Sequence, residues 1–462
     1  MFRNRVSEIK SIEDVISQKS QKAKAILLYG RRRVGKSTLL EEIKRRCDKT
    51  FIYFTATKSK YEIIISRFAA AIAEELGEEY YRHIKDIHAI LMALKSTGKE
   101  FVIAIDEYQY MKGAYKDGNL DSIFQAEIQQ LPGSFTFIFA GSYISEMKDM
   151  AEADEPLYGR FQLMMDLKPF DYLDAAAFYE ELTPYEKIGY YAVFGGYPFA
   201  LDYLHPNKSL RWNIENILLD TKGYVYTSLR HALLREIFKI EMAESILLYL
   251  GNGKARNSEI ASAISASSAS VSIEIKKLLN MEIVSSTFPI NRKKDEKKNF
   301  YEISDNLLRF FYTYILPNEN ETDLRGPSAF YKRFIEPSIT DFIARRFERI
   351  IPEYLRRLIR LGKADDIVDI GTYWYDMPKE KRNGEFDCAV KKDNGYTIIE
   401  CKYLKDKMKK SLAISEENKI RMIDGLDVNE IGFASANGFD FDSSNLMISG
   451  SDLYALKDLK ES

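Results

Sequence analysis

GRRRVGKS, at residues 30–37, fits the pattern G-x-x-x-x-G-K-[ST], which is typical of a phosphate-binding loop. The apolar run KAILLY (24–29) precedes this stretch and indicates a buried strand, whereas STLLEEIKRR (37–46) follows it with helical periodicity. The backbone N–H groups of such a loop and the N-terminus of the following helix attract anionic oxygens. The sequence therefore predicts a strand–loop–helix unit that binds the phosphates of a nucleotide.

Each residue type in this loop has its own chemical role. Glycines at 30 and 35 permit a tight turn and a close approach of the backbone to the ligand. The lysine reaches the outer phosphates, and the serine hydroxyl binds Mg²⁺. The residues predicted to contact ATP are Gly30, Arg31, Arg32, Arg33, Val34, Gly35, Lys36, Ser37 and Thr38.

A second motif, FVIAIDEYQY (101–110), places two acids directly after an apolar strand. The carboxyl ends of parallel strands are where ligands of such sheets bind. We predict that Asp106 holds Mg²⁺ together with Ser37 and that Glu107 polarises the attacking water. A third strand ends at Ser142, whose hydroxyl could contact the γ-phosphate, although a serine in this position also commonly caps a helix. The motifs together indicate a Mg²⁺-dependent ATPase.

Composition narrows the class of protein. Charged residues make up 29% of the 462 residues, but the formal net charge is only −2, so any contact with nucleic acid requires a local basic patch. Four scattered histidines and three scattered cysteines form no disulfide framework or zinc site. No apolar run of 18 residues occurs. We therefore expect a cytoplasmic protein with no membrane partner.

The chain divides into four expected domains of overall α/β class. Residues 1–166 alternate strands with helices, which predicts a P-loop NTPase core with a parallel sheet. Residues 167–235 are helical and rich in Tyr and Phe, which suits a helical lid. A winged helix is expected at 236–316 and an α/β domain at 328–462, with the polar stretch 316–328 as a linker.

The winged-helix interpretation depends on three short helical segments followed by two strand-like runs and a charged hairpin tip, NRKKDEKK (291–298). From Lys254 to Phe300 the net charge is +4, nine basic residues against five acidic ones. The third helix offers Ser268, Ser270, Ser272, Lys276 and Lys277 to phosphates. We predict contact with DNA here, while a protein–protein module remains the alternative.

The C-terminal stretch GEFDCAVKKDNGYTIIECKY (384–403) predicts a β-hairpin. Asn394-Gly395 is a strong signal for a two-residue turn. A turn at that position would place Asp387 opposite Lys402. Because side chains alternate along a strand, Asp387, Glu400 and Lys402 then share one face.

Two carboxylates and an ammonium on one face suit metal-dependent cleavage of phosphodiesters. Asp387 and Glu400 would hold Mg²⁺ or Mn²⁺, and Lys402 would orient the attacking water. Glu348, on an amphipathic helix expected at 339–358, could add a further carboxylate. The alternative is an exposed hairpin face with a cross-strand Asp–Lys salt bridge.

The motifs together resemble a known family. FRNRVSEIK (2–10), the phosphate-loop stretch, IDEYQY, FAGSYI (139–144), LYGRFQ (157–162) and FGGYPFAL (194–201) resemble the archaeal-type ATPases of the AAA+/STAND superfamily. The tail resembles the restriction-endonuclease-like domain, of PD-(D/E)xK type, that is fused to that family.

The resemblance implies ATP binding and hydrolysis, with Arg5 near the adenine pocket. It also implies that Arg160 is an arginine finger or a sensor of the γ-phosphate; a finger acting on another subunit would require a homo-oligomer. The C-terminal triplet would form the PD-(D/E)xK-like site, although Phe386 stands where the motif has proline.

We interpret the chain as a Mg²⁺-dependent ATPase whose nucleotide state repositions a winged helix and a nuclease-like domain on DNA. The alternative is a nucleotide-switched regulator that binds DNA or protein and carries a catalytically inactive nuclease-like module. The complete triplet of Asp387, Glu400 and Lys402 favours the enzyme.

Overall fold

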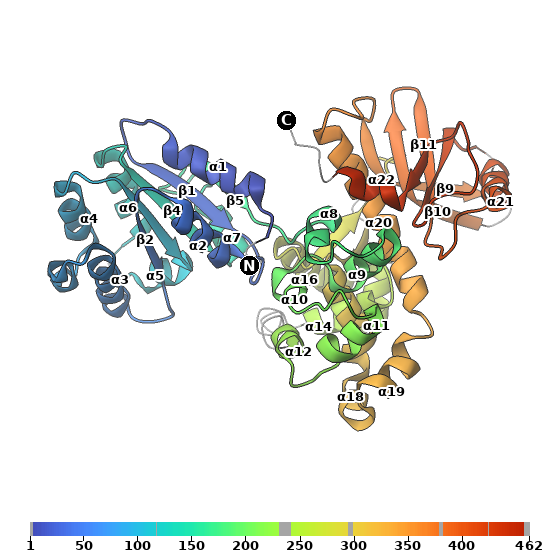
Figure 1. Cartoon of the computed structure of the whole chain (residues 1–462), viewed down its shortest axis with the longest axis horizontal. Coiled ribbons are helices and arrows are strands. Elements are labelled where there is room, and N and C mark those ends of the chain that lie inside the picture. Colours follow the sequence, from blue (N-terminus) through green and yellow to red (C-terminus); the bar gives the residue numbers. More distant parts are fainter. Residues whose placement is uncertain are drawn as a thin grey trace. The chain divides into compact units, whose positions relative to one another are not determined.

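The chain forms two compact units, Met1–Pro169 and Phe170–Ser462 (Figure 1). The computed structural model describes residues 3–116, 118–230, 242–293, 299–377, 382–423 and 425–456. Within these ranges, no helix is long and apolar enough to cross a membrane. The expected ATPase core, 1–166, lies inside the first unit. The expected boundary at 235/236 and most of the hairpin tip NRKKDEKK lie outside the described residues.

The first unit contains a parallel sheet of order β2-β3-β4-β1-β5. Its strands are β1 (Lys24–Tyr29), β2 (Thr50–Thr55), β3 (Phe101–Asp106), β4 (Phe135–Gly141) and β5 (Phe161–Asp166). β1, β3 and β4 are buried along their whole length, which explains their continuous apolar sequences. β5 is not predicted by its sequence, because this edge strand is only partly buried and carries no long apolar run.

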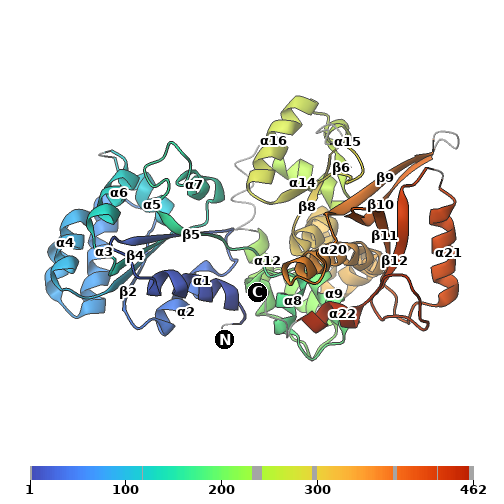
Figure 2. The ribbon, with the colours of Figure 1, turned by 90° about the horizontal axis from the view of Figure 1, so that it is seen from above.

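Helices cover both faces of this sheet. Figure 2 shows α1 and α2 on one face, with α5, α6 and α7 on the other. Ala25 and Leu27 pack into the core that α3, α4 and α6 cover, and the two-residue period of the strand turns Ile26 and Leu28 to the opposite face. The helices are α1 (Val6–Ser17), α2 (Lys36–Arg46), α3 (Tyr61–Leu76), η1 (Glu79–His83), α4 (Ile87–Ser96), α5 (Tyr108–Ala114), α6 (Leu120–Gln130) and α7 (Ile144–Asp149).

The strand order brings three sequence motifs to one edge of the sheet. β4 lies between β1 and β3, and all three strands run in the same direction. The loop after β1, the acids after β3 and the serine after β4 therefore emerge side by side at the carboxyl edge.

The second unit begins with a helical segment whose aromatic residues form its core. These elements are α8 (Tyr172–Ala175), η2 (Ala176–Phe178), α9 (Pro184–Phe194), α10 (Pro198–Leu201), α11 (Leu210–Asn213), η3 (Ile214–Leu218) and α12 (Tyr224–Ser228). Thr183 and Glu186 form a capping box at the start of α9. Gly196 follows α9, and a side chain there would lie 1.8 Å from the carbonyl oxygen of Phe170.

Three helices and a small antiparallel sheet follow within residues 236–316, where a winged helix is expected, and the winged helix stays a prediction. They are α14 (Ala243–Gly251), β6 (Ala255–Arg256), α15 (Asn257–Ala263), α16 (Ser268–Asn280), β7 (Val284–Thr287) and β8 (Phe300–Ile303). The sheet has the order β6-β8-β7, and the two-residue strand β6 is too short for its sequence to predict it.

The prediction of a linker at 316–328 is wrong, because this stretch forms helices. The helices here are α17 (Asn306–Phe310), η6 (Phe311–Ile315), η7 (Leu316–Asn318), α18 (Glu319–Arg325), α19 (Pro327–Phe330) and η8 (Tyr331–Ile335). Glu319 and Glu321 lie in the first turn of α18, where acids are favourable, and Gly326 ends that helix with a φ of 70°. Phe330 is fully buried, so tertiary packing stabilises a segment of polar composition.

The C-terminal part contains a mixed sheet between two layers of helices. The elements are α20 (Ile339–Arg360), β9 (Asp369–Met377), β10 (Arg382–Lys392), β11 (Gly395–Lys402), α21 (Lys410–Arg421), β12 (Val428–Ser435), β13 (Met447–Ser449) and α22 (Gly450–Ala455). The order is β13-β12-β11-β10-β9, and α21 lies on the face opposite to α22 in Figure 1. Cys388, Val390 and Ile399 join the core that includes α20, as predicted.

The β10–β11 hairpin has a different register from the predicted one. Lys392 pairs with Gly395, so the two turn residues are Asp393 and Asn394, and Ala389 pairs with Ile398 rather than with Glu400. Gly395 has a φ of 132° and begins β11 instead of forming part of the turn. Because the shift is two residues, Ala389 to Lys392 keep their predicted faces, but the strand pairing of β10 is irregular between Phe386 and Ala389, so alternation is interrupted at Asp387.

Candidate nucleotide site and carboxylate cluster

The phosphate-binding loop connects β1 to α2, as its sequence predicts. A Cβ atom at Gly30 would lie 2.3 Å from the carbonyl oxygen of Leu167, so only glycine fits there. Gly35 has a φ of 96° immediately before Lys36, the first residue of α2. The loop therefore has the close backbone turn that a phosphate cradle requires.

Lys36 lies across this loop. Its side chain is 5% exposed, and Nζ donates hydrogen bonds of 2.7 and 3.1 Å to the carbonyl oxygens of Gly30 and Arg31. These carbonyl contacts hold the ammonium where phosphate oxygens would meet the loop. A buried ammonium held among backbone carbonyls makes a phosphate a favourable partner for this charge.

The other loop residues lie around the same turn. Arg31 and Val34 are buried, whereas Ser37 and Thr38 are exposed in the first turn of α2. Arg32 donates a hydrogen bond of 3.0 Å to the hydroxyl of Tyr110. The remaining predicted loop residue, Arg33, adopts a left-handed backbone with a φ of 69°.

The two predicted magnesium ligands lie together. Ser37 Oγ donates a hydrogen bond of 2.6 Å to Asp106 Oδ2, and the hydroxyl of Tyr53 donates one of 2.9 Å to the same oxygen. Asp106 is 1% exposed, and its second oxygen accepts from the backbone N–H of Glu107 at 2.9 Å. Adjacent hydroxyl and carboxylate oxygens fit the preference of Mg²⁺ for hard oxygen ligands.

Glu107 is held beside this pair by Gln109 of α5 and by Ser142, which directly follows β4. It is the N-cap residue of α5, with a left-handed φ of 54°. Its carboxylate accepts a hydrogen bond of 2.9 Å from Ser142 Oγ and another from the Gln109 amide. Ser142 therefore contacts the predicted catalytic acid directly.

Arg5 links the N-terminal segment to the phosphate loop. It donates hydrogen bonds of 3.1 Å to the carbonyl oxygen of Val34 and 2.6 Å to that of Lys168, and it pairs with Glu8 at 2.8 Å. Arg5 therefore lies beside the phosphate loop, while its predicted position near the adenine pocket stays a prediction.

The expected position of Arg160 near the phosphates of its own chain is wrong. Arg160 directly precedes β5, and Phe161 pairs with Ala25 near the start of β1. The phosphate loop follows the other end of β1, about 20 Å away along a six-residue strand. Because parallel strands begin at one edge and end at the other, Arg160 lies at the amino edge. Action on a neighbouring subunit stays a prediction.

The members of the C-terminal triplet have different partners, and the irregularity between Phe386 and Ala389 leaves their predicted shared face a prediction. Lys254 pairs with Asp387 at 2.6 Å and with Glu385 at 2.9 Å. Lys402 pairs with Glu400 at 2.9 Å instead of with Asp387. The predicted cross-strand Asp387–Lys402 pair does not form, because the two-residue shift in register moves the two side chains apart along the strands.

Glu348 extends from α20 toward these acids. Burial, and then the negative charges of Asp387 and Glu400, raise the pKa of Glu348 to about 7. Within the described ranges, no three His, Cys, Asp or Glu side chains are arranged to hold a metal ion. Lys254 pairs with Asp387, and metal binding by Glu348, Asp387 and Glu400 stays a prediction.

Sequence reasoning missed several contributors to these sites. Gln109 carried a signal, since it lies in the IDEYQY motif two residues after Glu107. Tyr53 and Lys254 carried none. Tyr53 reaches Asp106 only because β2 pairs with β3, and Lys254 reaches Asp387 only through tertiary packing.

Comparison with known proteins agrees with the geometry of the first site. Residues 2–204 match the family model described as an ATPase domain predominantly from Archaea. This part of the chain is therefore similar to the ATPase domains of that family. Residues 311–418 match a family of archaeal and bacterial proteins of unknown function. The predicted ATPase resemblance is confirmed, while the restriction-endonuclease resemblance stays a prediction.

Two further comparisons concern most of the chain. An uncharacterized protein of Methanocaldococcus jannaschii is 24% identical over 455 residues, which cover 94% of this chain and 95% of that protein. A Walker-type ATPase of Pyrococcus abyssi is similar in structure, with a TM-score of 0.50 and 18% identity over 67% of this chain and 96% of that one. The ORC2 protein of Aeropyrum pernix has a TM-score of 0.45, with 13% identity over 70% of this chain and 96% of that one. The Pyrococcus likeness supports the fold of a P-loop ATPase.

Proposed function

We propose that this protein hydrolyses ATP with Mg²⁺ at the carboxyl edge of the first sheet, and that its nucleotide state controls a DNA-directed second unit. The observation that carries the ATPase part is the 2.6 Å contact between Ser37 and Asp106 beside the buried Lys36. Ser37 and Asp106 would hold Mg²⁺, which when bound would supply positive charge to stabilise the charge that develops on the phosphates.

The residues of the chain supply the remaining steps. Lys36 exchanges its two carbonyl contacts for phosphate oxygens, and Ser37 and Asp106 would hold the metal. Glu107 accepts the hydrogen bond of the attacking water and so orients it toward the γ-phosphate. Ser142 keeps the Glu107 carboxylate in place through the 2.9 Å hydrogen bond.

Two variants test these roles. Lys36→Ala should lose most ATP affinity, because it removes contacts made in the ground state, whereas Glu107→Gln should bind ATP and lose about 10²-fold or more in turnover. Calorimetry measures binding, and phosphate release with and without DNA measures turnover. Exposed Lys99→Ala serves as the control. A rate of ATP hydrolysis equal to that of the wild type in either variant would contradict the proposed roles of Lys36 and Glu107.

A PD-(D/E)xK-like role for the C-terminal sheet is supported by the ion pair of Glu400 with Lys402 and by the interaction of Glu348 with Asp387 and Glu400. The contact of Lys254 with Asp387 favours the second candidate, a regulator with an inactive nuclease-like module. The ammonium lies against the carboxylate that a metal would need, and so competes with a cation there.

Lys254→Gln separates these candidates. Removing the ammonium should strengthen Mn²⁺ binding in the absence of nucleotide by roughly tenfold or more, since it leaves Asp387 and Glu385 without their cation. Calorimetric titration measures the affinity, with exposed Lys363→Gln as the matched control. Equal affinity in the wild type and in an Asp387→Ala, Glu400→Ala double variant would show a salt-bridged face only. Metal binding without plasmid nicking in any nucleotide state would favour the regulator.

A further inference from the structure

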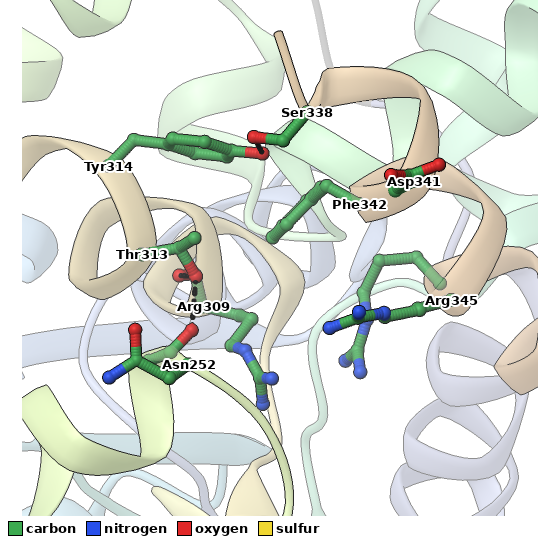
Figure 3. Close-up of a pocket in the computed structure, with 10 residues that line it drawn as sticks. Asn252, Arg309, Thr313, Tyr314, Ser338, Asp341, Phe342 and Arg345 are labelled. Atoms are coloured by element: carbon green, nitrogen blue, oxygen red, sulfur yellow. Dashed lines mark hydrogen bonds between the residues drawn. The ribbon is translucent and has the colours of Figure 1, made fainter. Parts of the chain in front are cut away.

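A cavity of about 170 Å³ lies inside the second unit, away from the carboxylate cluster (Figure 3). It is enclosed by the end of α14, by α17 with η6, and by the first half of α20. Its charged lining residues are Arg309, Asp341, Arg345 and Arg346. Three arginines against one aspartate give the lining a formal charge of +2.

Arg309 is the buried member of this lining. Its side chain is 5% exposed, and within the described residues its Nη1 has no hydrogen-bond partner. Burial, and then the like charge of Arg346, lower the pKa of the Arg309 guanidinium. A buried cation with a free donor is costly unless an anion pairs with it.

The nearby carboxylate does not satisfy Arg309. Glu302 acts on Arg309 electrostatically, but it accepts its hydrogen bond from Arg346 at 3.3 Å and also pairs with Arg349. Asp341 lines the opposite side and is exposed. In Figure 3, Arg309 and Arg345 extend toward the same space from different helices.

Neutral polar groups complete the walls. Thr313 Oγ1 donates a hydrogen bond of 2.7 Å to the carbonyl oxygen of Gly251, and the hydroxyls of Tyr314 and Ser338 lie 2.9 Å apart. These contacts fix the ends of three helices around the cavity. The site is therefore built from rigid elements and not from a loop.

We propose that this cavity binds the phosphate group of a small phosphorylated molecule, with Arg309 as the buried anchor and Arg345 and Arg346 beside it. Guanidinium groups match phosphate oxygens in geometry, and a dianion balances the lining charge of +2. The volume holds one or two phosphate groups. The burial of Arg309 keeps it out of reach of a duplex backbone that lies on the surface.

Binding can be measured on the full chain in a Lys36→Ala background, which weakens the phosphate loop as a competing site. The probes are inorganic phosphate and pyrophosphate, titrated calorimetrically in a phosphate-free buffer. We expect Arg309→Gln to weaken binding about tenfold or more, since a charged hydrogen-bond partner is lost. The matched control, Arg333→Gln on an exposed arginine of the same unit, should leave the affinity unchanged.

A second variant tests the proposal in case the Arg309→Gln protein does not fold. Arg345 is exposed at the cavity, so Arg345→Gln should fold normally and weaken binding several-fold. Unchanged affinity in both variants, or no binding by the Lys36→Ala protein, would overturn the proposal. So would a result in which Arg309→Gln affects only a 5′-phosphorylated oligonucleotide, because the cavity would then be a nucleic-acid end site.

Discussion

At the scale of single residues, the nucleotide site depends on carboxylates whose oxygens accept hydrogen bonds from neighbouring groups. Asp106 accepts hydrogen bonds from Ser37, Tyr53 and the Glu107 backbone, so its orientation is settled before a ligand arrives. Glu107 has a left-handed backbone, which costs about 1–3 kcal/mol for a residue other than glycine. Such strain commonly marks residues whose direction matters for function.

Glu353, on α20, makes stability depend on pH. Burial, and then the negative charge of Asp171, raise its pKa to about 8, and the hydroxyl of Tyr191 donates a hydrogen bond of 3.4 Å to it. An unfolded glutamate has a pKa of about 4.3, so the folded state binds the proton more tightly. Stability linked to this group is therefore full below pH of about 4.3 and is lost as the pH rises to about 8.

Glu353→Gln should remove this contribution. We expect the thermal midpoint of the variant, relative to the wild type, to rise between about pH 5.5 and about pH 8.5, because the wild type must ionise a buried acid over that window. Scanning calorimetry at both pH values measures the difference. Exposed Glu181→Gln should show no such change, and a pH-independent difference for Glu353→Gln would contradict the prediction.

At the scale of elements, the β10–β11 hairpin shows what changes when the turn lies at a different position from the one that the sequence predicts. The turn lies one residue earlier than the Asn-Gly signal predicts, and the register moves by two. Ala389 to Lys392 nevertheless keep their predicted faces, because only a shift by an odd number would exchange them, whereas the irregularity between Phe386 and Ala389 interrupts the alternation at Asp387. The cross-strand partners changed, so Lys402 contacts Glu400 and Lys254 contacts Asp387.

The exposed side of α16 gives an element-scale prediction for DNA. Ser268, Ser272, Lys276 and Lys277 are exposed on this helix. A Lys276→Gln, Lys277→Gln variant should weaken duplex binding similarly for all sequences and reduce the slope of log K against log salt by about 2. Fluorescence anisotropy at several salt concentrations measures this. The matched control, Lys332→Gln with Lys363→Gln, should keep the wild-type slope, and an unchanged slope in the α16 variant would favour a protein-binding module.

At the scale of the whole molecule, the chain separates the ATPase domain from a second unit in which helices, a small sheet and the C-terminal sheet share one core. Segments far apart in sequence contact one another there. Ile290 N donates a hydrogen bond of 2.8 Å to Thr372 O, and Asn291 exchanges two hydrogen bonds with the Trp374 backbone. We therefore predict that the small sheet β6-β8-β7 and the C-terminal sheet move as one body.

Arg160 provides a test of assembly. It lies at the amino edge of its own sheet, so any contact with a γ-phosphate requires a second copy of the chain. Arginine fingers contribute roughly 10³-fold or more to the rate. Mixing Arg160→Ala with Glu107→Gln should restore part of the turnover that each variant lacks, as measured by phosphate release. Wild-type turnover of Arg160→Ala alone would make Arg160 a structural residue.

The sequence by itself determined the ATPase half of this protein. Its phosphate loop, the acids after β3 and the serine after β4 are local motifs, and each follows a continuous apolar run that is long enough to predict a buried strand. The parallel α/β class follows from their alternation with helices. The inward face of Cys388, Val390 and Ile399 also followed from the sequence, because alternation along a strand is a local property.

Only the tertiary structure decided which residues meet across long distances. The edge strand β5, the position of Arg160, the helices at 316–328 and the pairing of Lys254 with Asp387 depend on contacts between segments far apart in the chain. Local composition carries no information about such contacts. A polar stretch forms a linker where it is surrounded by water, and the same stretch forms a helix where it packs against a core. The arginine-lined cavity is of this kind, because α14, α17 and α20 bring its residues together only when they pack.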